Sequence, residues 1–306
     1  MKKILSIISL LIVILMLISC SDKIDEEIVQ PTEETVERDP VNYTVYADFS
    51  MGSQISLESE EISKVTLKPA SEKEFSFIGR DFVDRPENTN DTFEVQIRNE
   101  LYEFGYFGSR KIFSSSNTSK LKNREIVNVY LSDTRHIEIS AGDERPLFFF
   151  TNSNQRVTDG DFTEEEAVEA AKSVIAELYG ADAIEGYSRI KFSDDGEPKE
   201  DYSIGFRKKI FGYDTNDTVI VSFDMAGNFI GFNAYKYGIL ENAEKDLTKE
   251  EIEKAIAYVE DTFSDNWDIG TPSVVADTEG DYYIEVGLSR KKGENIEAMQ
   301  IHVNIR

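Results

Sequence analysis

The sequence contains few of the residues on which most catalytic and metal sites depend: one cysteine, two histidines and one tryptophan among 306 residues. A single cysteine excludes an internal disulfide, and with only two histidines it leaves little for a zinc site. Basic residues are also scarce, with 33 Lys and Arg against 59 Asp and Glu and a formal net charge of −26. Because such a chain repels phosphates, we expect no nucleic-acid partner. We also expect no metal and no cofactor.

Hydrophobic residues are sufficient for a folded core. They make up 40% of the chain and include 19 Phe and 14 Tyr, which excludes disorder throughout. The length predicts about two domains.

Long apolar runs are missing except at the N-terminus, where Met1-Lys2-Lys3 precedes a run over residues 4–18. A run of this length is typical of a signal peptide and is short for a transmembrane helix, which needs about 20 residues. The run ends in Leu17-Ile18-Ser19-Cys20. We therefore predict a signal peptide over residues 1–19.

These last four residues resemble the lipobox of bacterial lipoproteins. The resemblance implies that Cys20 receives diacylglycerol, that the chain is cut before Cys20, and that the protein is held on the extracytoplasmic face of the cell membrane by lipid. Residues 1–19 contain two lysines and no acid, so cleavage would move the net charge from −26 to −28. The alternative is an uncleaved N-terminal anchor with an incidental cysteine.

The next segments are predicted from their composition and periodicity. Residues 20–41 are rich in acids and contain Pro31 and Pro40, which favours an extended, solvated tether. Residues 42–151 contain short alternating runs such as Phe93, Val95 and Ile97. Period-2 alternation of this kind predicts a β-rich domain of mainly antiparallel sheet.

Two amphipathic helices with the same design are predicted in the second half of the chain. Thr163 with Glu166 and Thr248 with Glu251 form two capping-box patterns, preceded by Phe162 and Leu247. The apolar residues that follow are spaced for one helix face, and the two sets are 85 residues apart: Ala167, Ala170, Ala171, Val174 and Leu178 in the first, and Ile252, Ala255, Ile256, Val259 and Phe263 in the second.

Similar strands follow each helix. Tyr202 to Lys209 and Tyr283 to Lys292 both run from a tyrosine through a glycine into a basic triplet, and residues 224–228 predict a hairpin with positive φ at Gly227 and Asn228. We therefore predict an α+β fold, in which the β-rich domain is followed by two helix-plus-antiparallel-sheet repeats at residues 160–240 and 247–306.

The motifs Thr163 to Ala167, Tyr202 to Arg207 and Asp224 to Gly227 resemble the PepSY and YcdB/YcdC-type repeats of bacterial envelope proteins, over residues 160–306. The layout also resembles lipoproteins of low-GC Gram-positive bacteria. The resemblance implies a cystatin-like architecture and an inhibitory or peptide-binding role, with an envelope protein or a peptidase as a partner. Phe211-Gly212 stands where the family usually has Asn-Gly.

Candidates for catalysis are weak. His136 is interpreted as a polar residue at a strand edge and His302 as an outward strand residue. No metalloprotease motif, phosphate loop or nucleophile elbow is present. Residues 194–197 and 214–217 are oxygen-rich segments, but neither has the spacing of a calcium loop. We therefore predict no catalytic residues.

Two other groups could bind ligands. The triplets Arg207, Lys208, Lys209 and Arg290, Lys291, Lys292 could contact an anionic wall polymer, lipid headgroups or an acidic peptide, or could be counter-charges for neighbouring acids. Aromatic clusters at residues 102–107 and 148–150 could form a sugar platform, although core packing explains them more simply.

The sequence thus predicts a non-enzymatic lipoprotein of the cell envelope that is a binding or inhibitory module for peptide, protein or wall material. Strand addition at a sheet edge is one route by which it could bind. The alternative is the solute-binding lipoprotein of a transporter, which needs many alternating helices and strands. A hydrolase is a third hypothesis with no motif behind it.

Overall fold

The structure is a computed structural model that describes residues 43–48, 67–69, 74–75, 77, 82–84, 90–113, 120–152, 156–192, 200–293 and 295–305. The predicted signal peptide (1–19), the lipidation site Cys20, the tether (20–41) and the acidic segment 194–197 lie outside these residues. No helix in the described part of the chain is both long and apolar enough to cross a membrane.

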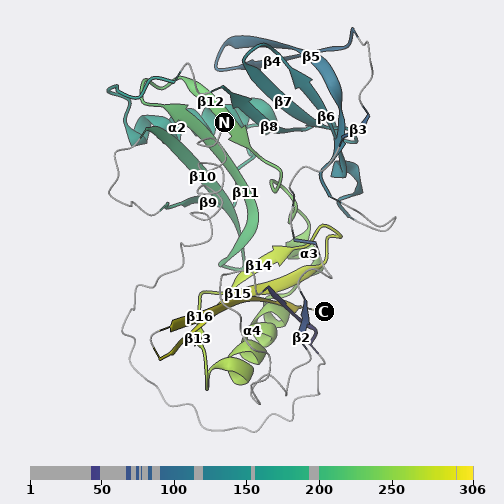
Figure 1. Ribbon diagram of the computed structural model, residues 1–306, viewed down its shortest axis with the longest axis vertical. Coiled ribbons are helices and arrows are strands. Elements are labelled where there is room, and N and C mark those ends of the chain that lie inside the picture. The colour runs from purple at the N-terminus through teal and green to yellow at the C-terminus, as the bar shows by residue number, and fades with distance from the viewer. Residues whose placement is uncertain are drawn as a thin grey trace. The chain divides into compact units, whose positions relative to one another are not determined.

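The chain forms two compact units, each assembled from segments far apart in the sequence (Figure 1). Unit 1 draws on Met1–Glu72, Glu250–Pro272 and Ile284–Arg306, and unit 2 on Lys73–Lys249 and Ser273–Tyr283. The segments predicted as the β-rich domain and as the second repeat each contribute to both units.

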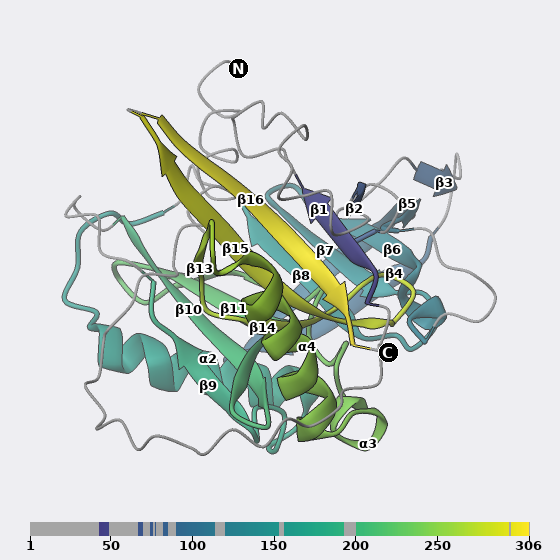
Figure 2. The ribbon, with the colours of Figure 1, turned by 90° about the horizontal axis from the view of Figure 1, so that it is seen from below.

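Unit 1 combines one helix with a small mixed sheet. Its elements are β1 (Val45–Asp48), β2 (Leu67–Pro69), α4 (Lys249–Phe263), β13 (Asp268–Ile269), β15 (Tyr282–Lys292) and β16 (Asn295–Asn304). β1 pairs parallel with β2 and antiparallel with β16, which places Val45 opposite Val303. β15 and β16 run side by side (Figure 2), and the short β13 pairs antiparallel with β15.

Unit 2 is built mainly of antiparallel strands. Its elements are β3 (Phe82–Asp84), β4 (Thr92–Ile97), β5 (Glu100–Lys111), the 3-10 helix η2 (Lys122–Arg124), β6 (Ile126–Leu131), β7 (Arg135–Ser140), β8 (Pro146–Thr151), α2 (Glu164–Tyr179), β9 (Tyr187–Ile190), β10 (Asp201–Ile210), β11 (Tyr213–Asp224), β12 (Phe229–Asn233), α3 (Ala243–Asp246) and β14 (Ser273–Ala276). The strand order is β14-β11-β12-β8-β7-β6-β5-β3, with β4 also paired to β5, β10 to β11 and β9 to β10.

Helix α2 buries its predicted apolar face in the core of unit 2. Ala167, Ala171 and Val174 are fully buried, and so is Ile175, which the predicted stripe omitted. The capping box is confirmed, because the Thr163 hydroxyl accepts from the Glu166 amide while the Glu166 carboxylate accepts from the Thr163 amide. The helix thus begins at the predicted residue.

The prediction of an α+β fold with two helix-plus-sheet repeats is wrong. The described residues form sixteen strands but only three α-helices, one of them four residues long. The predicted repeats are not closed sheets, because β12 pairs with β8, β11 pairs with β14, and β16 pairs with β1. Two of the pairings, β1 with β2 and β11 with β14, are parallel. Apolar alternation shows which face of a strand is buried but does not identify its partner.

The predicted hairpin over residues 224–228 is present between β11 and β12. Asp224 Oδ1 accepts from the amides of Ala226 and Asn228, and Gly227 has φ 81°. Asn228 does not take the predicted positive φ; its side-chain amide instead donates to Asp224 Oδ2 at 2.9 Å. In this turn Gly227, and not Asn228, provides the left-handed backbone.

A second turn of the same design, which the sequence analysis missed, spans residues 277–281. Asp277 Oδ1 accepts from the amides of Glu279 and Asp281, and Gly280 has φ 83°. The shared Asp-x-x-Gly spacing could have revealed it, because the carboxylate and the glycine perform the same two tasks in both turns.

The turn between β10 and β11 carries local strain. Phe211 and Gly212 have φ values of 50° and 93°, as a two-residue hairpin turn of type I′ requires. Glycine adopts such values readily, whereas a left-handed backbone costs an ordinary residue about 1–2 kcal/mol. Phe211 also remains 38% exposed, so packing offsets little of this cost.

We therefore predict that Phe211→Asn raises the free energy of unfolding by about 1 kcal/mol, because asparagine tolerates positive φ better than phenylalanine. Urea unfolding followed by circular dichroism measures the change. Phe107→Asn is the control, since Phe107 is similarly exposed at 42% and does not have positive φ. A loss of stability in Phe211→Asn that equals or exceeds that in the control would contradict the prediction.

Candidate functional site

The two predicted basic triplets lie in different units, and three of their six residues contact acids. In β10, Arg207 and Lys209 both contact the carboxylate of Asp214, at 3.2 and 3.4 Å. In β15, Arg290 donates to Glu297 at 2.7 Å. Lys208 is half-buried and Lys291 is exposed, whereas the side chain of Lys292 lies outside the described set. These contacts agree with the counter-charge interpretation, and a role in anion binding stays a prediction.

Both histidines are bonded to glutamates. His136 Nε2 lies 3.1 Å from Glu138 Oε1, and His302 Nε2 lies 2.9 Å from Glu285 Oε2. The prediction that His302 points outward is wrong, because it is only 4% exposed. Its partner across the sheet is Tyr46, which is also buried, so β16 is covered on both faces.

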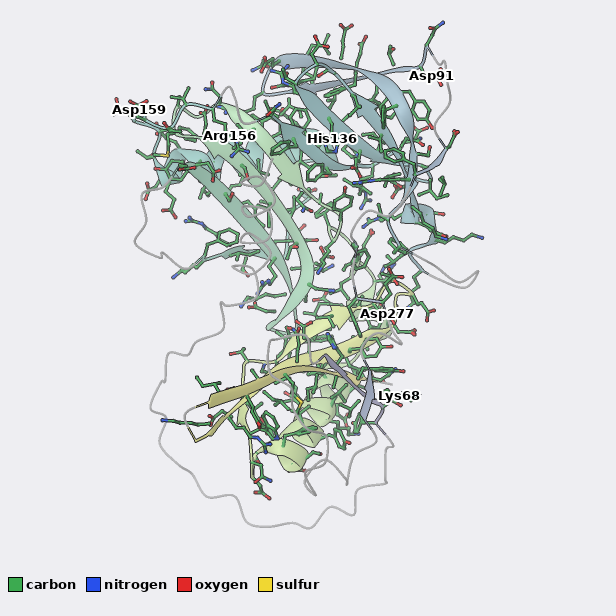
Figure 3. All side chains as sticks on the ribbon, in the orientation of Figure 1. Lys68, Asp91, His136, Arg156, Asp159 and Asp277 are labelled. Carbon is green, nitrogen blue, oxygen red and sulfur yellow. The ribbon has the colours of Figure 1, made fainter. Side chains whose placement is uncertain are left out.

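Glu138 is the centre of a buried polar network in unit 2 that includes His136, which is labelled in Figure 3. It accepts from Tyr235 Oη at 2.5 Å and from Arg110, which also donates to Tyr235. Burial alone would raise the pKa of Glu138, but the bonds from His136 and Tyr235 and the charge of Arg110 outweigh it and hold the pKa below its ordinary value. The network joins β5 and β7 to the segment after β12.

A second buried carboxylate, Asp217, has a structural role. The acidic segment 214–217 is part of β11, and Asp217 accepts from Tyr187 Oη at 2.6 Å and from the amides of Gly238 and Leu240. Complete burial raises its pKa in spite of these bonds. Its oxygens thus position the segment after β12.

The aromatic clusters divide between the core and the surface. Tyr102, Phe104 and Phe149 are buried, whereas Phe107 and Phe150 are 42% and 39% exposed. Phe148 stands between His136 and Tyr235, with ring centroids 4.9 and 5.7 Å away. Phe148 is thus packed between its neighbours, which agrees with the core-packing interpretation for this ring.

A cluster of three acids in unit 2 lies in the turn over residues 277–281. Carboxylate oxygens of Asp277, Glu279 and Asp281 lie within 4.8 Å of one another; Asp277 is labelled in Figure 3. Asp277 accepts two backbone amides at Oδ1 and the Tyr283 hydroxyl at Oδ2. Because these bonds account for the position of Asp277, the group is explained by its Asp-x-x-Gly turn.

A cavity of about 310 Å³ lies in unit 1, between α4, β13 and β15. The helix and its C-terminal extension form one wall, and the two strands form the other. Its lining residues are Ile256, Val259, Glu260, Ser264, Trp267, Asp268, Ile269, Gly270, Pro272 and Val286. The apolar members lie deep, with Val259, Trp267 and Val286 at most 5% exposed, whereas Glu260, Ser264 and Asp268 are exposed at the mouth.

A strand edge borders this cavity. β13 pairs with β15 on one side only among the described strands, with Ile269 opposite Leu288. The Gly270 amide bonds inward to Gly287 O at 2.8 Å. Since N–H and C=O groups alternate in direction along an antiparallel strand, those of Ile269 face the outer edge. An extended peptide could pair there and direct a side chain into the cavity.

The sequence analysis missed this site. It assigned Ile256, Val259 and Phe263 to one buried helix face, but Ile256 is half-buried and lines the cavity. The useful signal was Trp267, the one tryptophan of the chain, which stands in an acidic stretch directly after the helix. A large apolar ring at such a position needs a covering wall.

Comparisons with known proteins show little. No protein-family model matches the sequence, and no curated protein matches it. Among solved structures, the chain is similar to the C-terminal domain of YpeB from Bacillus megaterium, with 11% identity and a TM-score of 0.32, over 72% of this chain and 86% of that one. A likeness at this level supports no argument about function.

We predict that Glu138→Gln lowers the free energy of unfolding at pH 7 by about 3 kcal/mol, because it leaves the partly buried Arg110 without its counter-charge. The folded-state pKa of Glu138 is below the ordinary 4.5 of an unfolded chain, so its stabilisation is complete above pH 4.5 and is lost as the pH falls through the folded pKa. The difference in the free energy of unfolding between wild type and variant should therefore become smaller below pH 4.5.

Urea unfolding from pH 7 to pH 3 measures this gap. Glu103→Gln, at an exposed position on β5, should change stability little at any pH. A gap of constant size from pH 7 to pH 3 would show that the Glu138 charge does not stabilise the fold.

Proposed function

We propose that this protein is a non-enzymatic lipoprotein of the cell envelope that binds peptide or protein segments in extended conformation. The observation that carries the proposal is the cavity beside the outer edge of β13. Strand addition draws affinity from backbone hydrogen bonds and specificity from pockets that take alternate side chains, and both parts stand next to each other here.

The membrane attachment in this proposal rests on the sequence. A basic start, an apolar run of signal-peptide length and Leu17-Ile18-Ser19-Cys20 support lipidation of Cys20 and display on the extracytoplasmic face. The resemblance of residues 160–306 to PepSY-type sequences of envelope proteins supports the same location. The acidic segment 20–41 would serve as the tether.

The non-enzymatic part is supported by the bonding of the candidate groups. His136 and His302 each bond a glutamate, and Glu138 and Asp217 are held by bonds that connect strands to loops. The solute-binding alternative has less support, because two described helices exceed one turn, where alternating helices and strands would be required.

For the lipid anchor, we expect that cells producing the wild-type chain incorporate radioactive palmitate into it and that Cys20→Ala abolishes the label. The physical reason is that Cys20 provides the one thiol that can accept diacylglycerol. Immunoprecipitation and autoradiography measure the incorporation, with Ser19→Ala as the control that keeps a small residue before the cysteine. Persistent labelling of Cys20→Ala would refute lipidation at this site.

For the binding site, we predict that a neutral hexapeptide of alternating threonine and valine with one central leucine changes the fluorescence of Trp267. Because Trp267 is the one tryptophan in the chain and lines the cavity, its emission reports entry of a side chain directly. Titration of the full-length chain in a non-ionic detergent measures the dissociation constant. We expect a value in the micromolar range, which corresponds to a binding free energy of about −8 kcal/mol.

Two controls test the route. Ser264→Phe fills the mouth of the cavity and should weaken binding at least tenfold, whereas Ser173→Phe, at an exposed position on α2, should not. N-methylation of the peptide backbone should also weaken binding. If the N-methylated and unmodified peptides bind equally, strand addition is wrong.

A further inference from the structure

The charges around the unit 1 cavity indicate which peptides it would select. Its inner wall is apolar, but Glu260 and Asp268 stand exposed at its mouth. An apolar cavity with an acidic rim favours a ligand that combines an apolar group with adjacent positive charge.

The helix itself strengthens this field. The C-terminal end of a helix carries a partial negative charge, so basic residues are favoured in its last turn and acids are not. The last turn of α4 contains no basic residue, while Glu260 belongs to it and Asp268 follows shortly after. The acids and the helix end therefore repel one another, and a cation bound at the mouth would relieve this repulsion.

Arg290, the basic residue beside Trp267, is already engaged with other groups. The Arg290 guanidinium lies 4.3 Å from the ring centroid of Trp267 and donates to Glu297 at 2.7 Å. Its charge is thus already shared with a carboxylate, and its planar group covers Trp267. The ring is held in place as a wall of the cavity, and Arg290 is engaged with Glu297.

We propose that the cavity binds a single bulky apolar side chain from an extended peptide whose flanking residues are lysine or arginine. The inference rests on the proposed peptide binding and adds the class of ligand. A volume of about 310 Å³ is at the small end of ligand sites, so it accommodates one side chain and not a whole cofactor. The flanking cations would contact Glu260 and Asp268.

Three hexapeptides separate this inference from the binding proposal itself. All contain the central leucine among threonine and valine, and the residues next to leucine are two lysines, two glutamates or two threonines. Titrated into the full-length chain in a non-ionic detergent at low salt, the lysine peptide should bind at least tenfold more tightly than the glutamate peptide. Added salt should reduce this ratio, because the charges are exposed.

Matched variants locate the effect. Glu260→Gln with Asp268→Asn should bring the lysine-to-glutamate ratio close to one, while Asp182→Asn with Glu185→Gln, which removes the same charge from exposed positions of unit 2, should leave the ratio unchanged. An equal drop in both variants would mean that overall charge, not the cavity mouth, sets the preference, and would overturn the inference.

The remaining outcomes are also decisive. If the threonine, lysine and glutamate peptides bind equally, the peptide site stands and its cationic selectivity is wrong. If none of the three changes the Trp267 fluorescence or releases heat in calorimetry, both the peptide site and its selectivity are wrong. A fourth peptide has glycine in place of the leucine between the two lysines. If it binds as tightly as the leucine form, binding depends on charge alone and the cavity takes no side chain.

Discussion

The pairing of β8 with β12 is the interaction on which unit 2 depends. It joins a strand from the first half of the chain to one from the second, with Phe149 opposite Phe232. The strands approach so closely that a Cβ atom at Gly231 would lie 2.5 Å from the carbonyl oxygen of Phe149, so only glycine fits there. Across this contact the rings of Phe149 and Phe229 meet at 4.9 Å and form the centre of the aromatic core. Helix α2 then covers a core that neither half of the sequence could complete alone.

Buried charges determine the course of the chain after β12. Glu138 binds Tyr235 and Asp217 binds the amides of Gly238 and Leu240, so two carboxylates from different strands fix three positions within six residues of chain. Their pKa values shift in opposite directions. For Glu138 the hydrogen bonds and the charge of Arg110 outweigh burial, whereas for Asp217 burial outweighs its hydrogen bonds and the charge of Lys208. Glu138 and Asp217 therefore have structural roles, although the protein is rich in acids. Each accepts hydrogen bonds from donors that would otherwise be buried without an acceptor.

The sequence was informative where structure is local. Thr163 with Glu166 predicted the start of α2, and Asp224 with Gly227 predicted a hairpin, because caps and turns involve neighbours in the chain. It was misleading where structure is long-range. The alternation around His302 indicated one exposed face, but the pairing of β16 with β1 buries it against Tyr46. The cavity of unit 1 depends on the same kind of long-range contact. Trp267 marked the place in the sequence, but the residues of β13 and β15 that face it could not be identified from the sequence.

The pairing of β1 with β16 also affects how the protein is made. Val45 pairs with Val303, far along the chain, so the sheet of unit 1 is incomplete until β16 has been synthesised. During that time β1 would leave a row of backbone groups without partners, which is a hazard for aggregation. Contacts this distant also make folding slow. A chain with this topology gains if β1 is kept from other partners until β16 has been made, so the order of its strands links its folding to the progress of its synthesis.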